Sequence, residues 1–213
     1  MRVSNVTKEI IEAWKQEYRA VYKTNIADQD FYFRPLTRQE LNNIRELMRD
    51  GNLSVDEFDE KIVDYCLLSP DWMIADFLSL EAGVLSSLSR AIQERSLIGA
   101  EPTTQTVFDQ YEKIKVPQEV IEQNRLHHKR MDLVTLAGHQ VLVRPLLRSE
   151  WNSVTKMQQE DPGMDIDREV CKTGLLFPAI EDLEALPGGF IQKISDSIME
   201  ISGFGETPSV ERL

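Results

Sequence analysis

Histidines can hold a zinc ion, and this chain has three of them. His127 and His128 are sequence neighbours, so a helix would turn their side chains roughly 100° apart, and His139 falls in an expected turn. A structural zinc site needs four cysteine, histidine or carboxylate ligands at close spacing. No cysteine or carboxylate joins these histidines at such a spacing, and the sequence therefore predicts no zinc site.

Acidic residues between positions 161 and 169 hint at a calcium-binding loop. Asp165, Asp167 and Glu169 alternate as the first oxygen ligands of an EF-hand do. That loop requires glycine at its sixth position and glutamate at its twelfth. Counted from Asp165, these positions hold Val170 and Leu176. The acidic residues are therefore interpreted as the start of a helix, where carboxylates interact favourably with unpaired amides.

Neither the cysteines nor the glycines form a catalytic pattern. Cys66 and Cys171 lie on expected apolar helix faces, and Lys172 would point away from Cys171, so both thiols are predicted to be buried and unreactive. Gly188 and Gly189 lack the spacing of a phosphate-binding loop and are predicted to start a helix. No nucleophile, base and orienting group occur at a spacing that indicates a catalytic site. The sequence predicts a protein that is not an enzyme and binds no cofactor.

Two arginines occupy the same place relative to a proline. Arg34 precedes Pro35, and Arg144 precedes Pro145. Each arginine would lie where a strand ends, because proline cannot donate to a strand ladder. Two roles are open for them: hydrogen bonding to the carbonyls of a neighbouring helix end, or contact with a partner.

A basic run covers residues 125–130 of an otherwise acidic chain. Its simplest interpretation is the solvated face of a helix, and contact with an acidic protein or with nucleic acid are the alternatives. The predicted partner-binding residues are cationic side chains of this run and the two strand-end arginines: Arg34, Arg144, Arg125, Lys129 and Arg130.

Composition narrows the choice of partner and compartment. The 24 basic and 36 acidic residues give a net charge of −12, whereas binding to a phosphate backbone requires a basic surface. No stretch approaches the roughly 20 apolar residues of a membrane-spanning helix, and residues 1–5 show no apolar signal core. The two cysteines do not suggest a disulfide framework. We expect a cytosolic protein that binds neither nucleic acid nor membrane.

The sequence around the two arginines occurs twice. Phe-Arg-Pro-Leu at 33–36 returns as Val-Arg-Pro-Leu at 143–146, an offset of 110 positions. The same offset relates residues 6–12 to residues 116–122. Two separate matches at one offset indicate a repeat rather than a chance similarity of short motifs.

The offset shrinks further along the chain. Leu-Leu-Ser-Pro at 67–70 returns as Leu-Leu-Phe-Pro at 175–178, which is 108 positions later, and residues 80–83 match residues 186–189 at an offset of 106. Small deletions between helices would produce this drift. A repeat of this length predicts a duplicated domain rather than a short-period solenoid.

The repeat divides the chain into a first copy at 1–100, a linker at 101–115 and a second copy at 116–213. Gly99, which closes the first copy, falls on Gly205. A copy of roughly 90 residues is small for burying a core of its own. We therefore expect the two copies to pack on each other as an internal pseudo-dimer.

Each copy is expected to consist of a helix, a β-hairpin and then further helices, which makes a predominantly helical α+β fold. Apolar residues three and four apart predict a helix over 7–21. Hairpins are predicted at 23–34 and 133–144. Thr37 and Glu40 form a capping box before the next helix. Leu147 replaces the threonine in the second copy, and this weakens that cap by about 1 kcal/mol.

Later helices are expected to start near Ser54 and Asp165, and a short helix is expected at 107–114 with Val107, Tyr111 and Ile114 on one face. The last helix of each copy should bury one apolar stripe. The stripes are Leu80, Val84, Leu88, Ala91 and Ile92 in the first copy and Leu186, Phe190, Ile194, Ile198 and Ile201 in the second.

These elements together resemble a known family. A hairpin ending in Arg-Pro-Leu-Thr-x-x-Glu at 34–40, a Leu-x-x-Gly step at 80–83 and 186–189, and an apolar helix closing near 202–204 are similar to the tail assembly chaperones and baseplate hub assembly proteins of long-tailed bacteriophages. The resemblance covers each copy nearly end to end. It implies non-covalent handling of tail or baseplate components, notably the tape-measure protein, without enzymatic activity. Family members commonly hold a single copy, so the duplication leaves open whether both copies keep one binding face.

The leading hypothesis is therefore a non-enzymatic protein of phage tail or baseplate morphogenesis that acts in the host cytoplasm during assembly. It would be either a transient chaperone or a hub subunit retained in the virion. One alternative is an adaptor module that binds a helical peptide between its two copies. Another is an enzyme whose acidic residues meet only in the folded chain.

Overall fold

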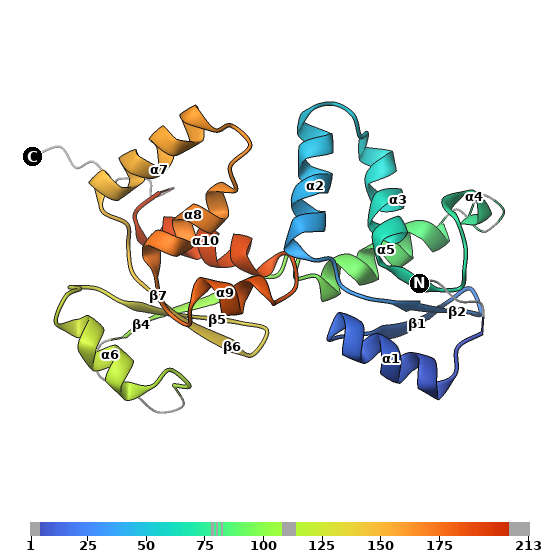
Figure 1. Cartoon of the computed structure of the whole chain (residues 1–213), viewed down its shortest axis with the longest axis horizontal. Coiled ribbons are helices and arrows are strands. Elements are labelled where there is room, and N and C mark those ends of the chain that lie inside the picture. The colour runs from blue at the N-terminus through green and yellow to red at the C-terminus, as the bar shows by residue number, and fades with distance from the viewer. Residues whose placement is uncertain (1–4, 78, 80, 82, 108–113, 205–213) are drawn as a thin grey trace, which may run out of the picture. The chain divides into compact units, whose positions relative to one another are not determined.

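The computed structural model describes residues 5–77, 79, 81, 83–107 and 114–204, and the chain divides into two compact units (Figure 1). The first unit comprises Met1–Gly99 together with Leu186–Gly189, and the second comprises Ala100–Ala185 together with Phe190–Leu213. About 51% of the described residues are helical, and each unit holds one small antiparallel sheet. The predicted α+β class is confirmed.

The first unit contains a sheet in the order β1-β2-β3 and five helices within its described residues. In chain order these elements are α1 (Lys8–Tyr18), β1 (Tyr22–Ile26), β2 (Gln29–Phe33), α2 (Arg38–Arg49), α3 (Val55–Cys66), β3 (Leu67–Ser69), α4 (Ile74–Phe77) and α5 (Gly83–Arg95). Both strand pairs are antiparallel.

The second unit contains a sheet in the order β4-β5-β6-β7, again with five helices in its described part. Its elements are β4 (Thr103–Thr106), α6 (Gln118–Arg125), β5 (Asp132–Leu136), β6 (His139–Val143), α7 (Arg148–Glu160), α8 (Ile166–Gly174), β7 (Leu175–Phe177), α9 (Ile180–Glu184) and α10 (Phe190–Ile201). From α6 onward, the order of helices and strands repeats that of the first unit.

Helices cover both faces of the first unit's sheet (Figure 1). Neighbouring residues of a strand point to opposite faces. Tyr32 meets Trp14 of α1, with ring centroids 6.2 Å apart, whereas Phe31 joins a buried cluster with Leu88 and Ile92 of α5. The helix α1 therefore lies on one face of the sheet, and α5 lies on the other.

Both predicted hairpins are present, and each closes through a two-residue turn. Ala27 and Asp28 have φ values of 50° and 60°, and Ala137 and Gly138 have φ values of 49° and 79°. Positive φ at both central residues is the mark of the type I′ turn, whose twist matches that of paired strands. His139 was expected in the turn but begins β6 instead, because the turn needs only two residues.

Polar side chains start the helices where the sequence predicted caps. Thr37 and Glu40 form the capping box of α2, and Ser54 and Glu57 form that of α3. The side chain of Asp165 accepts a hydrogen bond from the Arg168 amide at the start of α8. This contact confirms the interpretation of the acidic residues near 165 as the start of a helix.

The last helix of each unit buries most of the predicted stripe, while Ala91 of α5 is half-buried. Val84, Leu88 and Ile92 of α5 are buried, as are the four stripe residues of α10, namely Phe190, Ile194, Ile198 and Ile201. Leu80, which was assigned to the first stripe, lies outside the described residues, and Leu186 precedes α10. Gly188 and Gly189 stand directly before α10, in the segment that belongs to the first unit, where their amides donate to Leu36 O and Ser96 O.

The predicted linker over 101–115 is wrong in part, because Thr103–Thr106 form β4 and pair with β5. These threonines are mostly exposed. An exposed edge strand needs no apolar alternation, so the sequence carries no strand pattern there. The Thr106 hydroxyl donates to Asp132 Oδ1 across 2.9 Å. The second unit therefore begins at Ala100 rather than at 116. Tyr111 was predicted to lie on a short helix at 107–114, and Gly205 was predicted to match Gly99. Both residues lie outside the described residues.

The basic run is not a helix face. Helix α6 ends at Arg125, and residues 126–130 make a turn that leads into β5. The short strands β3 and β7 were also missed, because three residues are too few to show a period of two. Each of them directly follows a helix and pairs with the second hairpin strand of its unit.

Candidate functional site

Arg34 and Arg144 each hold together three parts of their own unit. Arg34 Nη1 and Nη2 donate to Glu40 Oε2 and Oε1 at 2.8 and 2.5 Å. Arg34 also donates to Pro35 O at 3.1 Å and to Tyr65 O, near the end of α3, at 2.8 Å. We call this set of contacts the arginine clamp of the first unit. It ties the strand exit to α2 and α3.

The second unit has the same clamp around Arg144. Nη1 and Nη2 donate to Glu150 Oε2 and Oε1 at 2.9 and 2.7 Å. The guanidinium also donates to Pro145 O at 3.1 Å and to Thr173 O, near the end of α8, at 2.9 Å. Both arginines thus bond carbonyls at a neighbouring helix end, which confirms the structural role among the two that the sequence left open.

The clamps keep both glutamates ionised. Burial opposes ionisation of Glu40, but the hydrogen bonds from Arg34 and from the Thr37 amide outweigh it, and the pKa of Glu40 lies below its ordinary value. In the second unit, the hydrogen bond from Arg144 is the main cause that lowers the pKa of Glu150. Each arginine charge is therefore compensated inside its own clamp.

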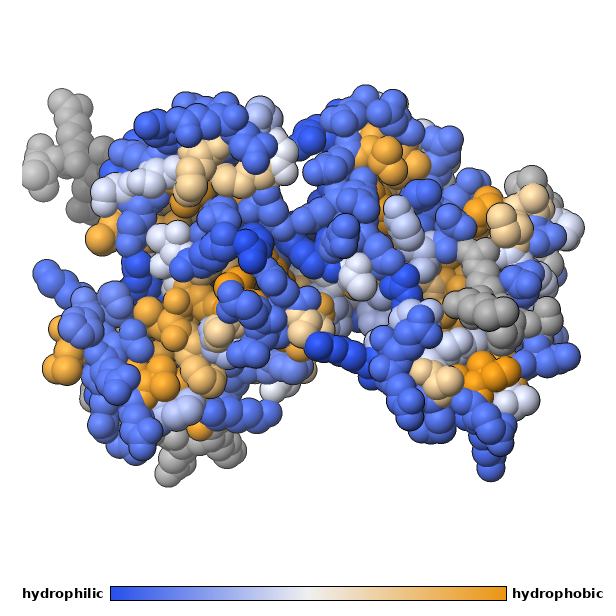
Figure 2. Space-filling model, viewed as in Figure 1, coloured by the Kyte–Doolittle hydropathy of each residue, from blue (hydrophilic) through white to orange (hydrophobic). Residues whose placement is uncertain are grey.

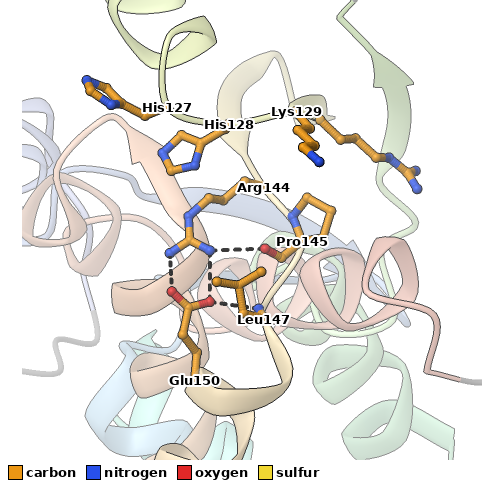
Figure 3. Close-up of a pocket in the computed structure, with 8 residues that line it drawn as sticks. His127, His128, Lys129, Arg144, Pro145, Leu147 and Glu150 are labelled. Atoms are coloured by element: carbon orange, nitrogen blue, oxygen red, sulfur yellow. Dashed lines mark hydrogen bonds and ion pairs between the residues drawn. The ribbon is translucent and has the colours of Figure 1, made fainter.

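The side chain that covers the clamp differs between the units. In the first unit, the Tyr18 ring lies over Arg34, with 5.3 Å between the guanidinium carbon and the ring centroid. The residue 110 positions later is His128, and Figure 3 shows its smaller ring beside Arg144. Burial, followed by the positive charge of Arg144, holds the pKa of His128 below its ordinary value. Its imidazole is thus disposed to be neutral in the free protein.

A cavity of about 490 Å³ opens beside Arg144 in the second unit (Figure 3). Its walls come from the turn after α6, the end of β6 and the start of α7. We call it the His128 hollow, and its lining residues are His127, His128, Lys129, Arg130, Arg144, Pro145, Leu147 and Glu150.

A second cavity of about 270 Å³ shares two residues with the first. It is lined by Val107, Arg125, His128, Lys129 and Met131. His128 and Lys129 therefore border both cavities. Four of the five predicted partner-binding residues, those at 125, 129, 130 and 144, line one cavity or the other, while Arg34 lies in the other unit.

The cations of the His128 hollow fall into two groups. Arg144 is held by Glu150, and Arg130 Nε lies 2.9 Å from Oδ2 of Asp132, a carboxylate that is only 1% exposed. Lys129, by contrast, has no carboxylate partner among the described residues. The ring of His127 lies against that of His128, with centroids 6.4 Å apart. Lys129 is thus the ammonium group available to a ligand.

An exposed leucine stands at the rim of the His128 hollow. Leu147 lines the hollow and is 63% exposed. Leu126, in the turn that carries the basic run, is also exposed. Figure 2 shows that hydrophilic side chains predominate on the face it presents, with smaller apolar areas among them. From the sequence, Leu147 is predicted only to weaken the cap of the helix that follows it. The signal in the sequence was a leucine just before a helix, at the place where the first unit has threonine.

The described residues offer no arrangement for metal or thiol chemistry. Within them, no group of three or more histidine, cysteine, aspartate and glutamate side chains is placed to hold a metal ion. Cys66 and Cys171 are buried, as predicted, and form no disulfide with each other, and burial raises the pKa of the Cys66 thiol. None of the helices in the described ranges combines the length and the apolar character needed to cross a membrane.

Comparisons with protein-family models, with curated proteins and with solved structures give no match for this chain. Its function must therefore be inferred from its residues and their geometry.

Proposed function

We propose that this chain is a tandem duplication of one unit and that it acts as a non-enzymatic assembly protein of a bacteriophage tail or baseplate. The observation that carries the proposal is the arginine clamp. It is built from the same contacts in both units, but a tyrosine covers it in one unit and a hollow opens beside it in the other. A repeated scaffold with one modified surface is what duplication followed by specialisation would produce.

Backbone contacts around the clamps support the duplication. The Arg34 amide donates to Cys66 O at 3.0 Å, and the Arg144 amide donates to Gly174 O at 2.9 Å. These partners are related by offsets of 110 and 108, the values at which the sequence motifs repeat.

Two serines make a further matched pair. The Leu36 amide donates to Ser96 Oγ at 2.9 Å, and the Leu146 amide donates to Ser202 Oγ at 2.8 Å. The two serines are 106 positions apart, which is the offset of the last sequence match. The offset between matching sequence motifs falls from 110 to 106 along the chain. The offset between residues that make equivalent contacts falls in the same way.

The tail assembly role is supported by the family resemblance and by the kind of surface that the chain offers. The motifs of that resemblance, Arg34 and Arg144 followed by Pro-Leu, lie within the two clamps. The second unit adds an open surface with exposed cationic and apolar side chains, which suits non-covalent protein binding. We propose tail or baseplate proteins, including the tape-measure protein, as partners. The site of action would be the host cytoplasm during assembly, and a hub subunit would remain in the virion.

Affinity capture tests the proposal. Tagged full-length chain, expressed in cells that make the tail and baseplate proteins of the phage in question, should recover one or more of these proteins by quantitative mass spectrometry. Recovery of no tail or baseplate protein would refute the proposal. Mass spectrometry of purified virions then separates the two forms of the role, because a chaperone should be missing from finished particles and a hub subunit should be present.

A further inference from the structure

We propose that the His128 hollow docks a segment of a partner protein in which an apolar side chain lies next to a carboxylate. This inference rests on the proposed function, and it assigns partner binding to one surface of the second unit. Leu147 would contact the apolar side chain, and Lys129 would pair with the carboxylate.

The apolar side chain of the partner segment is inferred from Leu147, the residue directly before α7. Thr37, at the matching place in the first unit, accepts a hydrogen bond from the Glu40 amide. Leu147 has no acceptor atom in its side chain, although Glu150 still accepts from the Leu147 amide at 2.7 Å. Threonine would complete this cap and would remove an exposed apolar side chain. Folding stability therefore favours threonine at this position, and a contact with a partner accounts for the leucine.

The carboxylate of the partner segment is inferred from the charges around the His128 hollow. Arg144 and Arg130 are compensated by carboxylates of the second unit. Lys129 adds a positive charge that no carboxylate of the described residues neutralises by an ion pair. A carboxylate beside Lys129 would also favour protonation of His128.

The first unit lacks this combination. The residues 110 positions before His128, Lys129 and Arg130 are Tyr18, Arg19 and Ala20. Tyr18 lies over the Arg34 clamp, and Thr37 stands where the second unit has Leu147. The proposed docking surface is therefore confined to the second unit, and the first unit supplies matched control positions.

A polypeptide segment fits the hollow better than a nucleic acid does. The two neighbouring cavities share His128 and Lys129 and together extend from Val107 to Leu147, which suits an extended or helical segment. A nucleic acid would bring many phosphates to a chain with a net charge of −12, and it requires several uncompensated cations. Leucine at the rim adds nothing to phosphate binding.

The test uses full-length chain and a fluorescein-labelled peptide that alternates leucine and glutamate, followed by fluorescence anisotropy. Lys129→Glu and Leu147→Thr should each weaken peptide binding by roughly tenfold or more. Arg19→Glu, the matched change in the first unit, should leave binding unchanged. Leu147→Thr should at the same time raise Tm by roughly 2–4 °C, because it completes the cap of α7. Higher stability with weaker binding distinguishes docking from a structural role.

Several results would overturn the inference. The inference is wrong if the parent chain does not bind the peptide, if Lys129→Glu and Leu147→Thr both bind it with the affinity of the parent, or if Arg19→Glu weakens binding as much as they do. It is also wrong if a peptide with glutamine in place of glutamate binds with equal affinity, or if a single-stranded DNA oligonucleotide displaces the peptide. Affinity capture separates this inference from the proposed function. Equal recovery of tail proteins by parent and Leu147→Thr would refute only the docking surface. Peptide binding without recovery of any tail protein would refute only the tail role.

Discussion

Replacing Arg34 with methionine should destabilise the first unit strongly. The change removes four hydrogen bonds and leaves the carboxylate of Glu40, which is only 18% exposed, without its cation. The Thr37 amide still donates to Glu40, so part of the compensation survives. Breaking one side of a fully buried ion pair costs about 3–5 kcal/mol. With this residual exposure and the remaining amide, we expect the free energy of unfolding to fall by about 2–4 kcal/mol.

Urea denaturation followed by tryptophan fluorescence measures this loss. Trp14 and Trp72 belong to the first unit, and Trp151 belongs to the second. A Trp151→Phe background therefore restricts the signal to the first unit. Glu40→Met and the double variant with methionine at 34 and 40 complete a mutant cycle, which isolates the pairwise term.

The cycle gives a clear criterion. We expect a coupling free energy of about 1.5–3 kcal/mol between Arg34 and Glu40, because the pair is charge-assisted and largely shielded. A coupling below about 0.5 kcal/mol, as for an exposed surface pair, would refute the clamp as a structural element. The pKa of Glu40 is lower in the folded chain than in the unfolded chain, so the contribution is fully present above the unfolded value. It should fade as the pH falls through the folded value.

Three further predictions concern the core, the thiols and the pH dependence of binding. Leu88→Asp or Ile194→Asp should unfold or aggregate the chain, since both side chains are fully buried and an unpaired carboxylate there costs several kcal/mol; a melting curve like that of the parent would contradict the assigned core. Cys66 and Cys171 should react with a thiol reagent only after urea unfolding, and rapid labelling of the native chain would contradict their burial. The acidic peptide should bind more tightly as the pH falls through the titration range of His128: burial, Arg144 and His127 lower its pKa and Glu150 raises it, and a bound carboxylate would raise it further. Affinity that does not change with pH in the parent would refute this linkage.

Local patterns in the sequence predicted much of each unit. The hairpins follow from apolar runs around a short turn, and the caps at Thr37, Ser54 and Asp165 follow from side chains that satisfy amides within three residues. The final helices follow from apolar residues at helical spacing, such as Val84, Leu88 and Ile92. These features depend on neighbours in the sequence, so local patterns are sufficient to predict them.

Features that depend on distant residues were missed. Thr103–Thr106 form β4 only because β5 lies alongside, some 30 positions later. The His128 hollow brings residues 127–130 next to Arg144 and Leu147, and no local pattern signals that meeting. The basic run was recognised by its charge. Its place in a turn after α6 depends on where the chain enters β5.

The most direct test of the account transfers the first unit's surface to the second. In the His128→Tyr/Leu147→Thr double variant, the second unit carries the residues that cover the clamp and cap the helix in the first. Affinity capture from cells that make the phage tail should recover tail or baseplate proteins with the parent chain. The double variant should recover none, although it melts at or above the temperature of the parent. Recovery of the same tail proteins by both chains, or by neither, would contradict the account.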